Sequence, residues 1–160
     1  MYRYQHDGWT LIELIVVVVL ISIIGTYSYF SMQSATINLG AQASQLASDI
    51  RYAQAQAMTK GQRYRWVKTS STTYQIQNST GMAIPLAQGS TTAVLGTGIV
   101  FGSIVNLPNS LINFDGQGTP YVDTSVPGTA LSSNATIALV SGSETRTVTI
   151  AAGTGSVSVQ

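Results

Sequence analysis

The amino-acid sequence predicts an α+β protein in which one long N-terminal helix packs on an antiparallel β-sheet. The chain has 160 residues, enough for one modest domain. An apolar run near its start leads into an amphipathic helical pattern, and strand-forming segments separated by turn residues fill the remainder. The apolar face of the helix needs a partner surface, and a sheet formed by the rest of the chain can supply it.

The first element is the apolar segment 9–30, which we expect to form a transmembrane helix. It opens with WTLIELIVVVVLISIIG, and a helix over the whole segment would span about 33 Å, enough to cross a bilayer core. The β-branched valines disfavour a helix in water, but in lipid the backbone must satisfy its own hydrogen bonds, which favours one. A secretory signal peptide is the competing interpretation. It predicts a shorter apolar core followed by a small-residue cleavage site, and the sequence has neither.

Residues 31–61 are expected to continue the helix in amphipathic form. Polar side chains, Asp49 among them, fall between apolar residues that recur at spacings of three and four. Those apolar residues are Leu39, Ala43, Leu46, Ile50, Ala53 and Ala57. Gly61 follows Lys60, which predicts a C-terminal stop with a cation near the negative helix end. We therefore expect one helix over about residues 9–60.

Residues 62–160 are expected to form a β-rich domain. Thr, Val, Ile and Tyr are enriched in seven candidate strands. These are Arg63–Lys68, Thr73–Gln77, Ala93–Phe101, Leu111–Phe114, Ala135–Val140, Arg146–Ala151 and Ser156–Val159. Ser141–Ser143 is a turn signal, so the flanking segments Ile137–Val140 and Thr147–Ile150 are expected to form a β-hairpin.

Glu13 is the single acidic residue within the apolar segment. A lone carboxylate near a membrane core costs on the order of 2–3 kcal/mol or more. Two interpretations remain open: the carboxylate lies at the headgroup level and stays hydrated, or it meets a positive partner inside an assembly. A free α-amino group would be such a partner if the chain were cut just upstream.

The residues upstream of Glu13 are compatible with such a cut. Met1–Gly8 is short and polar, and it ends in a glycine, which can enter a tight protease site in extended form because it has no side chain. Cleavage between Gly8 and Trp9 would make Glu13 the fifth residue of the mature chain. Arg3 and the initiator amine favour a cytoplasmic leader, which would place the C-terminal domain in the periplasm.

The stretch GWTLIELIVVVVLISII, Gly8 to Ile24, resembles the class III signal of type IV prepilins and pseudopilins. The shared pattern is a glycine, an aromatic residue or methionine, Thr-Leu-hydrophobic-Glu, and then an apolar run. The resemblance implies a leader peptide over residues 1–8, cleavage after Gly8 by prepilin peptidase and N-methylation of Trp9. It also implies that Glu13 pairs with the N-terminal amine of a neighbouring subunit.

Downstream segments are similar to the GspH/FimT-type minor pseudopilins. They are Leu46–Met58, Ile112–Pro120, Thr147–Ile150 and Gly153–Gly155. The resemblance implies a pilin-like fold and a low-abundance structural subunit that helps to start filament assembly at the tip. The filament would be a type II secretion pseudopilus or a type IV pilus.

The same resemblance implies partners and a location. The partners are other pilins or pseudopilins, prepilin peptidase, the inner-membrane assembly platform and membrane lipid. The chain would cross the bacterial inner membrane once, with residues 62–160 in the periplasm, and would then enter a periplasmic pseudopilus or a surface pilus.

The composition argues against catalysis, and we expect no catalytic residue, cofactor or metal site. The single histidine, His6, lies in the leader, and the chain has no cysteine. The acidic residues after the apolar segment are scattered, with no pair suited to acid–base chemistry. Asp115–Gly118 lacks the alternating acids and closing glutamate of a calcium loop, so a plain turn is expected.

Five cations with no acid among them suggest an alternative function: Arg51, Lys60, Arg63, Arg65 and Lys68. On a strand, Arg63 and Arg65 would face one side, with Tyr64 and Trp66 on the other. A solvated strand explains this pattern, and the alternative is a DNA-binding minor pilin that contacts phosphates during natural transformation. DNA-binding FimT-type pilins usually end in an arginine-rich segment, whereas this chain ends in GSVSVQ. The net charge of +1 is also unlike that of a general nucleic-acid binder.

Overall fold

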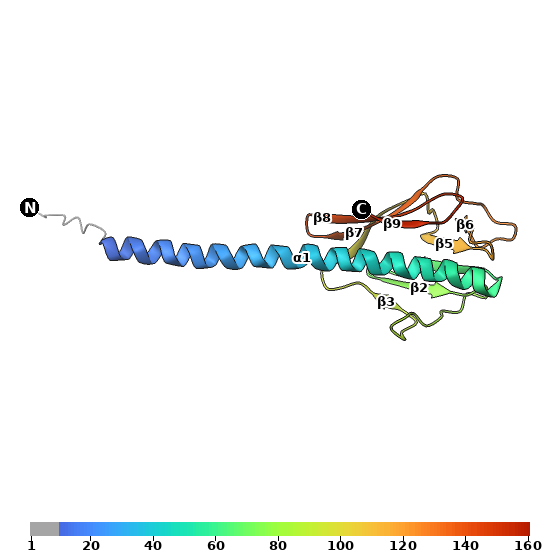
Figure 1. Ribbon diagram of the computed structural model, residues 1–160, viewed down its shortest axis with the longest axis horizontal. Helices are drawn as coiled ribbons and strands as arrows, with labels where there is room; N and C mark the ends of the chain where they lie inside the picture. Colours follow the sequence, from blue (N-terminus) through green and yellow to red (C-terminus); the bar gives the residue numbers. More distant parts are fainter. Residues whose placement is uncertain (1–9) are drawn as a thin grey trace, which may run out of the picture. The chain divides into compact units, whose positions relative to one another are not determined.

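The computed structural model describes the backbone of residues 10–160 and the side chains of residues 10–24 and 38–160 (Figure 1). The chain divides into two compact units, Met1–Ala35 and Thr36–Gln160. Helix α1, Leu11–Lys60, contributes to both units. Gly8 and Trp9, the residues of the expected cleavage site, lie outside the described residues.

Helix α1 begins with an N-cap that sequence analysis did not identify. The backbone N–H of Glu13 donates to Oγ1 of Thr10 at 3.3 Å and to the Thr10 carbonyl at 3.1 Å. Thr-x-x-Glu is the capping-box spacing, and an acid in the first turn interacts favourably with the positive end of the helix. The cap explains why the helix starts at Leu11 rather than at the expected residue 9.

Within the residues that the structure describes, no helix is both long enough and apolar enough to span a membrane.

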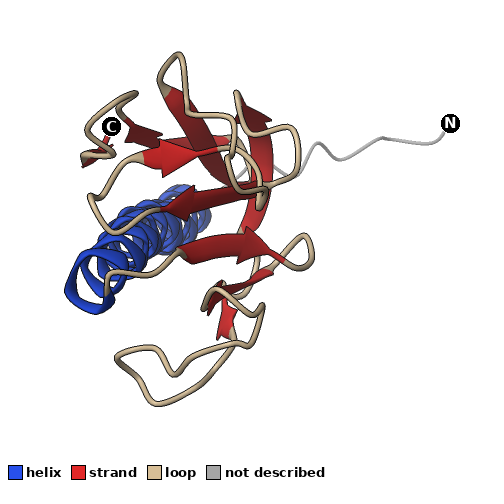
Figure 2. Ribbon diagram, turned by 90° about the vertical axis from the view of Figure 1, so that its right-hand side faces the viewer, coloured by secondary structure: helices blue, strands red, loops and turns tan. Residues whose placement is uncertain are grey.

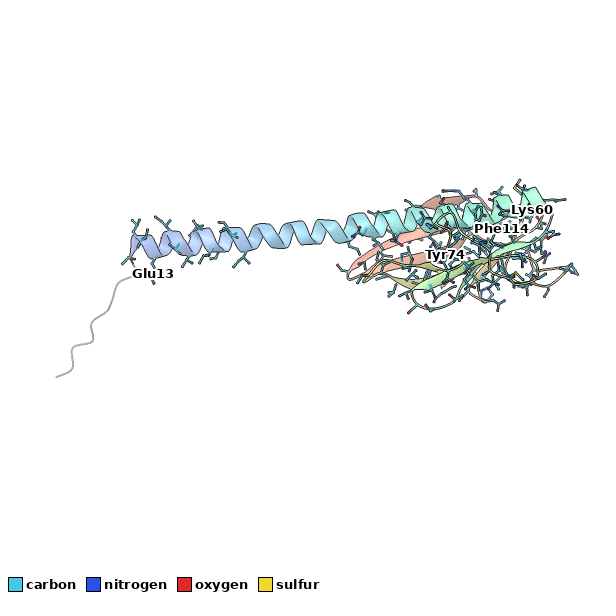
Figure 3. The ribbon with its side chains drawn as sticks, turned by 90° about the horizontal axis from the view of Figure 1, so that it is seen from below. Glu13, Lys60, Tyr74 and Phe114 are labelled. Atoms are coloured by element: carbon cyan, nitrogen blue, oxygen red, sulfur yellow. The ribbon has the colours of Figure 1, made fainter. Side chains whose placement is uncertain are left out.

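The C-terminal end of α1 confirms the predicted stop. Gly61 has a φ of 62°, in the left-handed region that favours glycine. The backbone N–H of Gln62 donates to the Ala57 carbonyl at 3.3 Å, which is the long hydrogen bond of a Schellman motif. Lys60 occupies the last turn, where a cation is favourable (Figure 3).

The unit Thr36–Gln160 holds two antiparallel sheets, rather than the single sheet expected (Figure 2). The first has the order β3-β2-β1-β5-β6, and the second has the order β4-β7-β8-β9. The strands of the first sheet are β1 Tyr64–Lys68, β2 Thr73–Gln77, β3 Ala93–Val94, β5 Leu111–Phe114 and β6 Pro120–Tyr121. Those of the second are β4 Val100–Val105, β7 Ala135–Ser141, β8 Glu144–Ile150 and β9 Val157–Val159.

The expected strand Ala93–Phe101 is wrong, because the segment divides between the two sheets. β3 pairs with β2, whereas β4 pairs with β7. A tight turn separates them: Ile99 N–H donates to the Gly96 carbonyl at 3.0 Å, and Gly98 has a φ of 80°. Strand propensity runs through this segment, but the Gly-Thr-Gly sequence within it breaks the strand.

The predicted β-hairpin is confirmed as β7 and β8. Ile137 lies opposite Val148, and Val140 lies opposite Thr145. Gly142 opens the two-residue turn with a φ of 59°, the sign that a type II′ turn requires at its first central position.

The core lies between the C-terminal half of α1 and the two sheets. All six residues of the predicted helical stripe are fully buried. Trp66, Ile112 and Phe114 reach this core from the first sheet, and Ile137 and Leu139 reach it from the second. The structure therefore confirms the expectation that an amphipathic helix packs on antiparallel β-structure.

Candidate functional site

The N-terminal part of α1 carries an exposed apolar surface. The side chains of Leu11 and Ile24 are 76% and 66% exposed, and most of the large apolar side chains between them are exposed as well. A soluble monomer rarely exposes a contiguous apolar surface of this extent, because such surfaces favour contact with lipid or protein. The exposed segment is therefore the first candidate site for a binding partner.

Glu13 lies in the first turn of this segment, and its side chain is exposed (Figure 3). Its backbone N–H is used by the Thr10 cap. Among the described residues, none donates a hydrogen bond to the Glu13 carboxylate. The carboxylate is thus accessible to a cation from outside the chain.

Asp49 is buried, although it is one of the polar residues that fall between the apolar residues of the amphipathic helix. Its side chain is 2% exposed. One carboxylate oxygen accepts a hydrogen bond from the Tyr74 hydroxyl at 2.7 Å, and the other accepts one from Nε2 of Gln45 at 3.0 Å. Because Tyr74 lies on β2, this contact ties the helix to the first sheet. Burial and the hydrogen bond to Asp49 raise the pKa of Tyr74 far above its ordinary value.

Three segments that resemble the pseudopilins meet at Gln54 of α1. Its Nε2 donates to the carbonyls of Gly118 and Thr154, each at 2.9 Å. Gly155 packs so closely that an added Cβ would lie 2.7 Å from Gln54 Nε2 and 2.9 Å from a ring carbon of Phe114. Gln54 therefore attaches the C-terminal part of α1 to the loops that contain Gly118 and Thr154. Sequence reasoning did not identify this structural role.

The expected turn at Asp115–Gly118 is confirmed. Oδ1 of Asp115 accepts the backbone N–H groups of Gln117 and Thr119, both at 2.9 Å. Oδ2 accepts the Tyr121 hydroxyl at 3.2 Å. The carboxylate thus closes its own loop. Across the described part of the chain, no group of His, Asp and Glu side chains is placed to hold a metal ion.

The five cations do not form one surface. Arg51 donates to the Val157 carbonyl at 2.7 Å, and Lys60 is exposed at the helix end. Nζ of Lys68 lies 5.7 Å from the centre of the Phe101 ring. Arg63 and Arg65 are the two cations that line a common cavity. Trp66, between them and Lys68, is fully buried, so it offers no stacking surface for a base.

A long N-terminal helix that packs on antiparallel sheets and exposes apolar side chains between Leu11 and Ile24 places this protein among the pilin-like proteins. The family model described as type II transport protein GspH matches residues 42–154. The match covers more than half of the chain, which therefore belongs to this family. It is a family of structural pilin and pseudopilin subunits.

Two proteins with solved structures are similar to this chain in fold. The type IV minor pilin FimU of Pseudomonas aeruginosa matches with a TM-score of 0.51 and 17% identity, over 75% of this chain and 90% of FimU. The minor pseudopilin EpsH from the type 2 secretion system of Vibrio cholerae matches with a TM-score of 0.57 and 10% identity, over 77% of this chain and 96% of EpsH. No curated protein matches the chain. The resemblance to GspH/FimT-type minor pseudopilins is thereby confirmed.

Proposed function

We propose that the chain is a minor subunit that helps to initiate a type II secretion pseudopilus or a type IV pilus at the filament tip. The observation that carries the proposal is the exposed apolar surface of α1 with the accessible carboxylate of Glu13 in its first turn. Such a surface becomes stable only when lipid or neighbouring helices cover it. The proposal assigns no catalytic step to the chain.

The proposal includes a membrane stage before assembly. The segment 9–30 crosses the membrane, with the leader cytoplasmic and the β-rich unit periplasmic. The length and apolar composition of this segment support this stage. Prepilin peptidase cleaves between Gly8 and Trp9, Trp9 is N-methylated, and the inner-membrane platform transfers the subunit into the filament.

Glu13 has a defined role in this transfer. Its carboxylate pairs with the N-terminal amine of the adjoining subunit, and the attraction between the two charges offsets part of the cost of burying them in an apolar environment. A charge-assisted hydrogen bond is strongest in such surroundings, because few water molecules compete for it. The same pair sets the axial register between neighbouring helices.

DNA binding during transformation is the alternative function that the basic residues suggested. It needs several cations in a row along one face, because affinity for DNA grows with the number of neutralised phosphates. Of the five cations, only Arg63 and Arg65 line the cavity, whereas Arg51 donates to the Val157 carbonyl and Lys68 lies over the Phe101 ring. We therefore prefer the assembly role.

A photocrosslinking experiment tests the assembly role. A benzophenone amino acid replaces Ile15, which is exposed in α1, and the cells are irradiated before the envelope is solubilised. We expect a crosslink to another pilin or pseudopilin that disappears in cells lacking the assembly platform. A crosslink that persists without the platform, or one to lipid alone in assembly-competent cells, would contradict the proposal.

A further inference from the structure

A cavity of about 300 Å³ lies on the side of the first sheet opposite Trp66. The side of the sheet follows from the register: Arg65 lies opposite Gln77 on β2 and opposite Asn113 on β5, so these three side chains share one face. Trp66, the next residue along β1, points into the core. Arg63, Arg65, Asn113, Thr124 and Val126 are among the residues that line the cavity.

The two guanidinium groups bring positive charge to the cavity, and no acidic side chain is among the described residues that line it. No described acidic side chain forms an ion pair with Arg63 or Arg65. Asp123 lies close enough to Arg63 to interact with it electrostatically, but its carboxylate is engaged in its own loop, where it accepts the backbone N–H groups of Ser125 at 3.2 Å and Thr129 at 2.9 Å. The hydrogen bonds from Thr129, with a smaller contribution from Arg63, lower the pKa of Asp123.

Both arginine side chains are held in place by neutral groups. Nε of Arg65 donates to Oε1 of Gln77 at 2.9 Å. Nη1 of Arg63 donates to the Ser125 carbonyl, and its guanidinium lies 4.5 Å from the centre of the Tyr121 ring. These contacts fix the two side chains but leave several N–H groups without an acceptor among the described residues, including both terminal nitrogens of Arg65.

We propose that this cavity binds the carboxylate of an acidic side chain on a neighbouring pilin-type subunit. The planar fork of a guanidinium matches a carboxylate in two parallel hydrogen bonds, and prior fixing of the fork reduces the entropy lost on binding. The inference rests on the proposed assembly function, because a neighbouring subunit supplies the acid.

Two features of the cavity favour a single side chain over nucleic acid. Val126 lines it with an 81% exposed apolar side chain, which suits the methylene groups of a glutamate. The cavity holds two cations, whereas a DNA backbone presents a row of phosphates that needs a row of cations.

The test follows the arginine Nε–Hε NMR resonances of the full chain in detergent micelles during titration with N-acetyl-glutamate N-methylamide. We expect saturable shifts of Arg63 and Arg65 with a Kd on the order of 1–10 mM. The glutamine analogue, which is uncharged, is expected to cause no saturable shift. Arg65→Gln should weaken binding about tenfold or more, and Lys60→Gln, which removes an equal charge elsewhere, should change it less than about twofold.

A second pair of variants leaves both arginines and strand β1 unchanged. Val126→Asp adds a carboxylate beside the two arginines at an exposed position and should compete with the ligand, weakening its binding at least about fivefold. Val105→Asp, at another exposed valine, should leave binding unchanged.

Three outcomes would overturn the proposal. The glutamate ligand could fail to saturate at concentrations about tenfold above the expected Kd, the glutamine analogue could bind as tightly as the glutamate ligand, or Lys60→Gln could weaken binding as much as Arg65→Gln.

Titration with a short DNA duplex tests whether the cavity binds nucleic acid instead. Tight duplex binding that Arg65→Gln abolishes, without shifts caused by the glutamate ligand, would assign the cavity to nucleic acid. The titration does not involve assembly, so its failure is distinguishable from loss of the crosslink at Ile15.

Discussion

Replacing Glu13 by glutamine is expected to lower incorporation of the chain into filaments by at least about tenfold, while membrane insertion is retained. Leaving one member of a buried charge pair without its partner costs about 3–5 kcal/mol, and each 1.4 kcal/mol is a factor of ten in an equilibrium. The measurement is the ratio of the subunit in the sheared filament or pseudopilus fraction to that in the membrane fraction, in cells that also contain the wild-type major subunit.

The choice of glutamine separates the pairing role from the capping role. Glutamine at the third helical position also serves in a capping box, so the helix start at Thr10 should be retained. Glu144→Gln is the matched control, because it removes one exposed acid at the start of β8. If the Glu13 and Glu144 variants enter filaments as efficiently as the wild-type chain, Glu13 does not pair with a neighbouring amine.

Tyr74→Phe is expected to lower the free energy of unfolding of the segment 36–160 by about 1–3 kcal/mol. The variant removes the 2.7 Å hydrogen bond to Asp49 and leaves a buried carboxylate with one donor fewer. Urea denaturation followed by circular dichroism measures the change. Tyr52→Phe is the control: Tyr52 packs against the core, and within the described structure its hydroxyl makes no hydrogen bond. Equal effects of the two variants would show that the contact between Tyr74 and Asp49 adds no stability.

The same hydrogen bond predicts a dependence of stability on alkaline pH. The pKa of Tyr74 is raised in the folded state, first by burial and then by Asp49, so the unfolded chain loses this proton at a lower pH than the folded chain. Its stabilising contribution is complete below the unfolded pKa and is lost as pH rises above it. The difference in unfolding free energy between wild type and Tyr74→Phe should shrink by about 1.4 kcal/mol for each pH unit above about 10. A constant difference between pH 9 and 11 would contradict this explanation.

The elements that local sequence determines could be predicted. The helical stripe from Leu39 to Ala57 follows from spacing alone, and Gly61 ends the helix because the required φ favours glycine. The β7–β8 hairpin follows from its short glycine turn. The N-cap at Thr10 had an equally local signal in the Thr-x-x-Glu spacing, in which Glu13 is the third helical residue.

The features that depend on distant contacts could not be predicted. Asp49 lies three residues after Leu46 and four before Ala53, so its spacing fits the buried stripe, while its polarity suggested the surface. Its burial requires the Tyr74 hydroxyl, which is 25 residues away in the sequence. Strand propensity likewise does not reveal that β3 and β4 join different sheets.

The placement of the five cations Arg51, Lys60, Arg63, Arg65 and Lys68 also could not be predicted from their closeness in the sequence. Five cations close in sequence suggested one surface, but the turn at Gly61 and the pleat of β1 send them in different directions. Arg63 and Arg65 remain together because alternate residues of a strand share a face. Their neighbours Asn113 and Val126 come from segments that sequence spacing could not bring to this place.

Mass spectrometry of the N-terminal peptide tests the central claim most directly, because the pairing role of Glu13 requires a new amine at Trp9. The protein is recovered from its native envelope and digested without prior enrichment of either the cleaved or the uncleaved chain. The expected peptide begins with N-methylated Trp9 and contains none of residues 1–8. Recovery of the assembled protein with Met1–Gly8 still attached would contradict the claim.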